Sequence, residues 1–230
     1  MRSKWGDKMA KYSVGIETKE KILSVCKKLF YEYGFEGTSY KMICDMANIN
    51  RGLLPYHFKS KSAIAQIIYN EFWDLYDSLI ENEFSGYSIV FKTSIQEVLL
   101  FRCLCSNEKF LRFYMEMKSN SCFGAYSLDK QEKFIKRILD ITHKEISQDE
   151  IVTLSCMFLG VENGLVYNVY SKKINEDADN IAKKDLQFVF SMLDYPLDII
   201  NEAYQEAVLM ADKYGMSVAD DFGVVLQSTS

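Results

Sequence analysis

Hydroxyl, aromatic and basic side chains gather between Thr38 and Lys61, in the stretch TSYKMICDMANINRGLLPYHFKSK. Thr38 and Ser39 stand where a helix is expected to begin. The free backbone N–H groups of a helix N-terminus, together with a hydroxyl, can hold a phosphate. Lys61 can bind a phosphate through its charge. These residue types suit contact with the backbone of a nucleic acid.

Other side chains in this stretch could contact base edges. Arg51 favours guanine, and Leu53 could meet the methyl group of a thymine. Tyr40 is a further candidate for base contact. Gly52 has no side chain, so it would let the protein backbone approach the DNA backbone closely.

Three more residues each have two interpretations. Tyr56 could contact a phosphate or pack in the core, and His57 could donate to a phosphate or complete the packing. Lys59 could contact DNA or be an ordinary solvated lysine. For the neighbouring Phe58, core packing is the favoured interpretation.

The elements that must position these residues are two short helices around a tight turn. Ile43, Met46 and Ala47 recur at helical spacing, and Asn48 to Asn50 then interrupt the pattern. Asparagine tolerates the left-handed backbone conformation that a sharp helix end requires. The pattern therefore predicts a helix that ends at this turn.

A second brief helix is expected over about 51–58, followed by a third. The side-chain oxygen of Asn50 could cap the second helix, and Ser60 could cap the third. Two helices joined by a three- or four-residue turn have the geometry of a DNA-binding helix-turn-helix, here about residues 39–58.

Together with the preceding helix, this stretch resembles the DNA-binding domain of the TetR family of bacterial transcriptional regulators. The resemblance covers about residues 16–76 and is carried by Gly34, Phe35, Thr38, Ser39, Ile43, Ala47, Ile49, Gly52, Tyr56, His57, Phe58, Ser60 and Lys61. In that family, the threonine and lysine that match Thr38 and Lys61 contact phosphates, as does a tyrosine near Tyr56. The resemblance also implies a pocket for a small-molecule effector.

Two residues depart from the family pattern. Asn48 stands where the family usually has glycine, which is a mild change. Pro55 stands where the family often has an aromatic residue, and proline is costly beyond the first turn of a helix. Pro55 therefore predicts a second helix that starts late or is distorted. The alternative function is a helical interaction protein whose helix-turn-helix no longer binds DNA.

The charge of the chain is unevenly distributed. Residues 1–62 hold 12 Lys and Arg against 6 Asp and Glu, whereas the remaining residues hold 15 against 26. A basic head on an acidic body fits a head that meets phosphate and a body that does not. Lys4, Lys8 and Lys11 lie in a first segment that is either a disordered tail or a basic arm that reaches DNA.

Apolar periodicity and only 2 prolines in 230 residues predict an all-α fold. The expected domains are an N-terminal arm (1–15), the DNA-binding domain (16–76), a helical ligand-binding and dimerisation domain (77–215) and a C-terminal tail (216–230). Helices are expected over 17–33 with Thr18 as its cap, 60–83, 88–106, 107–118, 126–146, 148–171, 177–193 and from Pro196 to about 213. No convincing strand is found.

Two of these helices have distinct expected roles. The helix over 60–83 would enter the body as a rigid connector. The helix over 148–171 is apolar on two sides, which suits a homodimer interface together with the last two helices. Two heads about 34 Å apart would bind a pseudo-palindromic operator in double-stranded DNA.

Aromatic and apolar residues of the body could line an effector cavity or could be ordinary core. The candidates are Phe101, Phe110, Phe113, Tyr114, Met117, Phe134, Phe158, Glu162 and Tyr167. Glu162 is the sharpest of them because it shares a face with Leu159 and Val166, and a buried carboxylate needs a partner. That partner could be a ligand's cation, a basic residue of the body or a group across a dimer.

Several classes of function are disfavoured by the sequence. The 6 cysteines (Cys26, Cys44, Cys103, Cys105, Cys122 and Cys156) form no C-x-x-C pair and are expected to be mostly buried thiols in a reducing cytoplasm. No metal, cofactor or catalytic motif is found, and no secretory signal or apolar run near ~20 residues. The expected protein is therefore a cytoplasmic regulator and not an enzyme, most simply a repressor that a small molecule releases from DNA.

Overall fold

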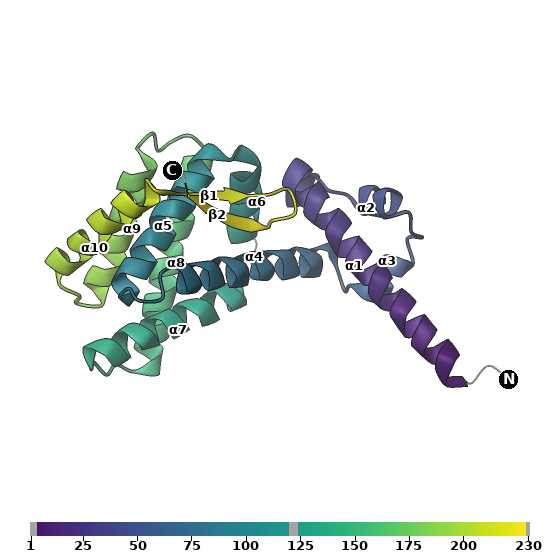
Figure 1. Cartoon of the computed structure of the whole chain (residues 1–230), viewed down its shortest axis with the longest axis horizontal. Helices are drawn as coiled ribbons and strands as arrows, with labels where there is room; N and C mark the ends of the chain where they lie inside the picture. The colour runs from purple at the N-terminus through teal and green to yellow at the C-terminus, as the bar shows by residue number, and fades with distance from the viewer. Residues whose placement is uncertain (1–3, 120–123, 229–230) are drawn as a thin grey trace.

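The computed structural model describes the backbone of residues 4–119 and 124–228, and the side chains of residues 15–119 and 127–228. Within this part of the chain a small helical head (α1–α3) is joined by α4 to a larger helical body, as Figure 1 shows. The elements are α1 (Lys4–Gly37), α2 (Tyr40–Ala47), α3 (Leu53–His57), α4 (Lys61–Glu83), α5 (Ile89–Ser106), α6 (Glu108–Ser119), α7 (Gly124–Thr142), α8 (Gln148–Tyr170), α9 (Ala178–Met192), α10 (Leu197–Ala211), β1 (Tyr214–Val218) and β2 (Val224–Ser228).

The first helix is longer than the sequence pattern predicts. It begins at Lys4, so the expected start near residue 17, with Thr18 as its cap, is wrong. The predicted end is right in its geometry: Gly34 takes φ 78° and ψ 168°, which breaks the helix and leaves one further turn after it. The side chains of the basic residues before Tyr12 lie outside the described residues.

The head is held by a core of buried apolar side chains. Ile22, Cys26 and Phe30 from α1 meet Ile43 from α2 and Leu54 from α3. Each side chain lies on the face that its helical spacing predicts. Burial of such side chains contributes about 1.5–3 kcal/mol apiece, so this small core can orient the three helices.

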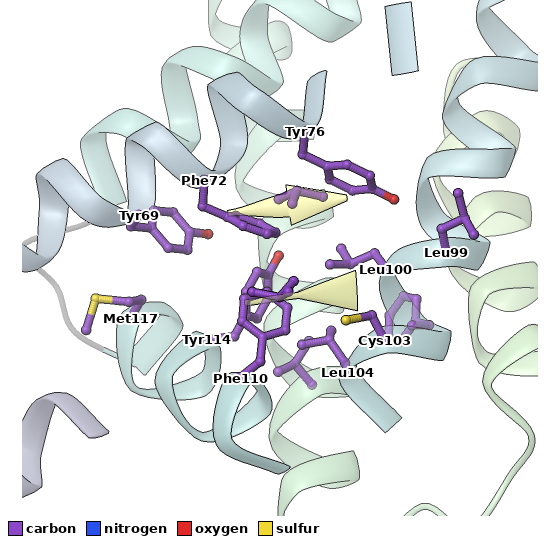
Figure 2. Close-up of a cluster of buried hydrophobic side chains, with 14 of the residues drawn as sticks. Tyr69, Phe72, Tyr76, Leu99, Leu100, Cys103, Leu104, Phe110, Tyr114 and Met117 are labelled. Carbon is purple, nitrogen blue, oxygen red and sulfur yellow. The ribbon is translucent and has the colours of Figure 1, made fainter. Parts of the chain in front are cut away.

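The connector α4 carries its apolar face from the head into the body. Ser60 caps it by accepting a hydrogen bond from the backbone N–H of Ala63 at 3.0 Å, as predicted. Further along, Phe72 packs against Phe110 of α6 with ring centroids 5.0 Å apart, and Tyr76 faces α5 (Figure 2). Helix α4 therefore contributes side chains both to the core of the head and to the core of the body.

The end of the chain forms a hairpin, contrary to the expectation that it contains no strand. β1 and β2 pair antiparallel, with Met216 opposite Leu226. The turn between them brings the Phe222 ring to 4.4 Å from the ring of Phe113 and to 5.8 Å from that of Tyr31. The hairpin thus touches both the body and the last turns of α1.

Helix α8 is apolar on two sides, as predicted. Its buried side includes Phe158 and Glu162, while Met157, Tyr167 and Tyr170 are exposed on the other. Of the helices in the described part of the chain, only α8 is long and apolar enough to be a candidate membrane span, and core helices of globular proteins often meet the same criterion.

The cysteines divide into two groups. Cys26, Cys44 and Cys103 are buried, as predicted, but Cys105 and Cys156 are exposed. Those two positions lie on the outer sides of their helices. Cys122 lies outside the described residues. Burial raises the pKa of both Cys26 and Cys103 to about 12, so these two thiols are protonated and unreactive at neutral pH.

Candidate functional site

The turn between α2 and α3 has the predicted conformation. Asn48 ends α2 in the left-handed region, with φ 49° and ψ 55°, and its backbone N–H donates to the Asp45 carbonyl oxygen. At the other end of α2, Ser39 accepts a hydrogen bond from the backbone N–H of Met42 at 3.2 Å. The two helices are therefore joined by the sharp turn of a helix-turn-helix.

Helix α3 begins late, as Pro55 predicts, but its cap is not the expected one. It starts at Leu53, and the side chain of Asn50 does not cap it. Instead the backbone carbonyl oxygen of Asn50 accepts from the Leu53 N–H at 2.9 Å. Pro55 lies in the first turn, where a helix N–H has no partner within the helix, so this proline removes no helical hydrogen bond.

Most of the predicted DNA-contacting side chains lie on the surface of the head. Tyr56 is 79% exposed, which excludes core packing for it, while Phe58 is buried. His57 is partly buried, and its ring lies edge-on to that of Tyr56 at 5.0 Å. The exposed members of the predicted set are Ser39, Tyr40, Arg51, Gly52, Leu53, Tyr56 and Lys59.

Thr38 and Lys61 instead make contacts inside the head. Thr38 is buried, with its hydroxyl 2.7 Å from the carbonyl oxygen of Gly34, so that hydroxyl does not face a phosphate. The Nζ of Lys61 donates to the carbonyl oxygens of Phe35 and Thr38, at 2.7 and 2.8 Å. The Lys61 backbone N–H also donates to the Tyr40 hydroxyl at 3.0 Å. Lys61 therefore ties α4 to the start of the helix-turn-helix.

A cavity of about 400 Å³ lies in the body, with walls from α4 to α9. Of the nine residues predicted to line an effector cavity, Phe134, Phe158 and Glu162 do so. The others do not line this cavity: Phe101, Phe110, Phe113, Tyr114 and Met117 are fully buried (several are drawn in Figure 2), and Tyr167 is half exposed on the surface of α8.

Glu162 has the partner that its buried position demands. One carboxylate oxygen lies 2.7 Å from the Nζ of Lys118, and the other accepts from the Tyr114 hydroxyl at 2.7 Å. Burial lowers the pKa of Lys118, but the charge and hydrogen bond of Glu162, together with Tyr69 and Glu97, raise it overall. Of the three partners considered from the sequence, the basic residue of the body is the one observed.

The sequence pattern did not single out the cavity's other carboxylates, among them Glu97 on α5 and Asp185 on α9. Asp185 interrupts the buried stripe of Ile181, Ala182 and Leu186. That is the same signal that singled out Glu162, so Asp185 could have been found from the sequence.

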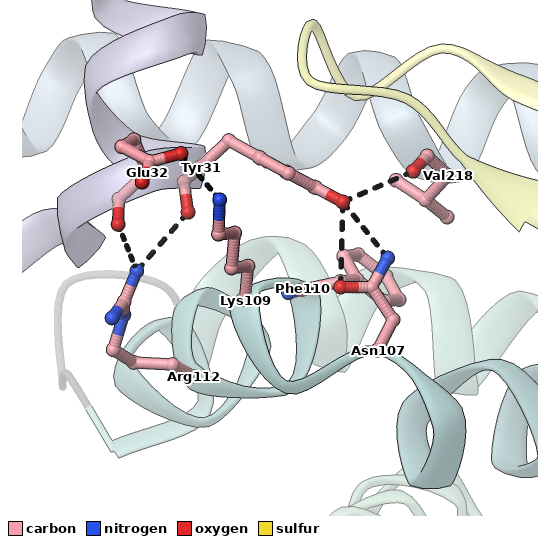
Figure 3. Close-up of polar contacts among 7 residues, drawn as sticks. All are labelled: Tyr31, Glu32, Asn107, Lys109, Phe110, Arg112 and Val218. Atoms are coloured by element: carbon pink, nitrogen blue, oxygen red, sulfur yellow. Dashed lines mark hydrogen bonds and ion pairs between the residues drawn. The ribbon is translucent and has the colours of Figure 1, made fainter.

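Head and body meet at a polar joint between α1 and α6, drawn in Figure 3. The Tyr31 hydroxyl accepts from the Asn107 side-chain amide at 2.9 Å and lies 3.4 Å from the Val218 carbonyl oxygen of the hairpin. Arg112 donates to the carbonyl oxygens of Tyr31 and Glu32, at 3.1 and 2.6 Å. These bonds cap the end of α1 with groups from the body.

Comparison with known proteins also matches the head to a family of bacterial regulatory proteins. The family model described as "Bacterial regulatory proteins, tetR family" matches residues 22–67. The probable HTH-type transcriptional regulator YttP of Bacillus subtilis is 34% identical over 85 residues, which are 37% of this chain and 40% of that protein. The chain thus spans less than half of YttP in this match.

Two staphylococcal proteins match over more of the chain. The regulator QacR of Staphylococcus aureus is 24% identical over 69% of this chain and 89% of its own length. The negative transcriptional regulator IcaR of the Staphylococcus epidermidis biofilm operon is 27% identical over 76% of this chain and 96% of its own.

The fold itself is found in solved structures. SmeT, the repressor of the Stenotrophomonas maltophilia multidrug efflux pump SmeDEF, superposes with a TM-score of 0.53 at 18% identity, over 76% of this chain and 89% of SmeT. The helix-turn-helix geometry, the family match and the shared fold agree. Residues 22–67 therefore match the TetR family of bacterial regulatory proteins.

Proposed function

We propose that this protein is a homodimeric transcriptional repressor of the cytoplasm that binds a pseudo-palindromic operator and releases it when a small molecule fills the body's cavity. The observation that carries the proposal is the exposed surface of the helix-turn-helix. Arg51, Leu53 and Tyr56 are exposed at the tip of the head, on a turn whose backbone has the required left-handed residue. That surface suits insertion into a major groove.

Phosphate contacts come from the exposed rim of the same surface. Ser39, Tyr40, Tyr56 and Lys59 are the candidates, because Thr38 and Lys61 are engaged inside the head. The excess of basic residues before residue 63 supplies the favourable field.

A dimer is required to read two half-sites, and exposed apolar residues support one. Tyr167 and Tyr170 on α8, with Leu197 and Leu209 on α10, are 39–65% exposed in the single chain. Exposed apolar patches of this kind mark protein interfaces. Gly164 of α8 has open space around it, so a partner helix could approach closely there.

The proposed repression and effector control are supported by the names of relatives and of structural neighbours. IcaR is named a negative regulator, SmeT is named a repressor and has a structure with triclosan, and the FadR structure from Bacillus subtilis contains stearoyl-CoA. The cavity of this chain has a volume that suits a small ligand. Its wall includes Tyr69 and Trp73 of α4, the helix whose first residue holds the head.

That connection suggests how release would occur. A ligand that displaces Trp73 would shift α4, and Lys61 would carry the shift to the carbonyl groups of Phe35 and Thr38. The two heads would then move out of register with adjacent major grooves.

The alternative of a helix-turn-helix that no longer binds DNA rested on Pro55. Since Pro55 lies in the first turn of α3, that reason is removed.

The test is selection from a randomised duplex pool by the purified protein at two salt concentrations, with sequencing of the bound fraction. A palindromic site whose affinity falls steeply as salt rises is the expected result. A folded protein that enriches no sequence would refute the proposal. The variant Leu209→Glu, measured by sedimentation, should shift the protein toward monomer and weaken binding to the full site.

A further inference from the structure

The charges that line the cavity form two layers. The outer layer contains bases whose side chains are 14–71% exposed, and each of them has an acidic partner. Lys92 and Arg137 pair with Glu81, Lys130 with Asp77, and Lys133 with Asp129. Because each of these charges is balanced by an adjacent partner of opposite sign, the outer layer exerts little net force on a ligand.

The inner layer is different, because its acids outnumber its bases. Glu97, Glu162 and Asp185 face the cavity with Lys118, and Lys118 is bound to Glu162 at 2.7 Å. Within the described residues, neither Glu97 nor Asp185 has a basic partner in an ion pair. Each also has a buried oxygen, Glu97 Oε2 and Asp185 Oδ1, that lacks a hydrogen-bond partner there.

This excess of carboxyl groups is reflected in the raised pKa values of Glu97 and Asp185. Burial raises the pKa of Glu97 well above its ordinary value, and the nearby Asp185 and Glu162 carboxylates add to this effect. Burial and Glu162 raise the pKa of Asp185 to about 7, although Lys118 opposes them. A positive charge placed beside both groups would lower these pKa values and favour the ionised carboxylates.

The surrounding side chains indicate what kind of cation fits. In the described part of the chain, no group of three His, Cys, Asp or Glu is arranged to hold a metal ion. The walls are aromatic, with Tyr69 and Trp73 on α4 and Phe134 and Phe158 on α7 and α8. Aromatic faces attract organic cations.

We infer that the effector is an organic cation with an apolar or aromatic body, and that its positive group faces Glu97 and Asp185. The inference rests on the proposed function only in treating the cavity's ligand as the effector. The aromatic walls would cover the body of such a ligand, and about 400 Å³ accommodates one of moderate size.

The test uses two probes of nearly the same shape and opposite charge, tetraphenylphosphonium and tetraphenylborate. Trp73 lines the cavity, so its fluorescence can report binding once the other tryptophan is removed by Trp5→Phe. Titrations at pH 8 are made with this background protein and with its Glu97→Gln and Asp185→Asn variants. Glu145→Gln removes an exposed carboxylate outside the cavity and is the matched control.

The expected result is that tetraphenylphosphonium binds at least about tenfold more tightly than tetraphenylborate. Glu97→Gln and Asp185→Asn should each weaken phosphonium binding by about tenfold or more, while Glu145→Gln leaves it unchanged. Circular dichroism confirms that each variant is folded.

Three outcomes would overturn the inference: equal or tighter binding of the borate, phosphonium binding that neither cavity variant alters, or no binding of either tetraphenylphosphonium or the smaller benzyltrimethylammonium. Operator binding is measured separately. Charge-selective binding without any operator would leave the cation site standing and refute the regulator. Recovery of an operator without charge-selective ligand binding would leave the regulator standing and refute the cation site.

Discussion

A carboxylate oxygen of Glu116, on α6 of the body, accepts a hydrogen bond at 2.6 Å from the backbone N–H of Phe35 in the head. Phe35 directly follows Gly34, where α1 breaks. Glu116 thus caps the last turn of α1 from outside the helix. The cap requires residue 34 to adopt a positive-φ backbone conformation, which residues other than glycine rarely adopt.

Gly34→Ala should therefore destabilise the joint between head and body. A Cβ at residue 34 would lie 2.7 Å from a carboxylate oxygen of Glu116, and φ 78° is itself strained for alanine. We expect a loss of about 1–3 kcal/mol in the free energy of unfolding, measured with urea. Gly86→Ala is the control, since nothing lies within 4 Å of that position. Equal stability of the two variants would contradict this geometry.

Lys61→Ala should weaken both DNA binding and folding. The side chain makes two hydrogen bonds to backbone carbonyl oxygens inside the head, so their loss should lower the melting temperature. Binding should weaken about equally for all DNA sequences, because the helix-turn-helix loses its anchor on α4. Lys59→Ala removes an exposed charge instead, so it should weaken binding and flatten its salt dependence without lowering the melting temperature. Identical melting curves for the two variants would show that Lys61 has no structural role.

Arg51→Ala should change which sequences bind. Arg51 is exposed at the turn before α3, where an arginine can bond the edge of a guanine. Selection from a randomised pool should show relaxed preference at one base position in each half-site, equivalent to about 1–3 kcal/mol. Lys59→Ala should keep every preference and lower affinity overall. A pool from Arg51→Ala that matches the parent pool would remove Arg51 from base recognition.

Asp185→Asn should stabilise the ligand-free protein at pH 8. The pKa of Asp185 is about 7 in the folded protein against 3.8 ordinarily, so between these values the folded protein holds a proton that the unfolded chain has released. Stability from this group is therefore present at low pH and lost as the pH rises through 7. Glu97, Glu162 and Lys118 face the same space.

Asparagine carries no such proton, so the variant should escape this loss. We expect its advantage in urea unfolding to be at least about 1 kcal/mol larger at pH 8 than at pH 5. Glu145→Gln should show no such difference. An advantage that is the same at both pH values would mean that Asp185 does not titrate in this range.

The sequence was informative wherever one helix face is buried. Ile22, Cys26 and Phe30 repeat at helical spacing, and their burial follows directly from it. Asn48 in the left-handed region and Ser60 as a cap were also predictable, because each depends on neighbours within four residues. The start of α1 was missed: Trp5, Met9, Tyr12 and Ile16 recur at helical spacing, but the lysines between them indicated a solvated segment.

Periodicity could not separate cavity from core. Phe110 and Phe134 both lie on apolar faces, but only Phe134 borders empty space, and that depends on how six helices meet. The hairpin was missed for a related reason. β1 and β2 are short, and their burial comes from packing against α4 and α5, which are distant in sequence.

The position of the hairpin has a consequence for synthesis of the protein. The Tyr31 hydroxyl meets Val218, which follows it by 187 residues in the chain. The three-helix core of the head involves only early residues, so it can form while the rest is still being translated. The contact between Tyr31 and the hairpin must wait for the last strands to leave the ribosome. During elongation the head is therefore folded but not yet held in place by the hairpin.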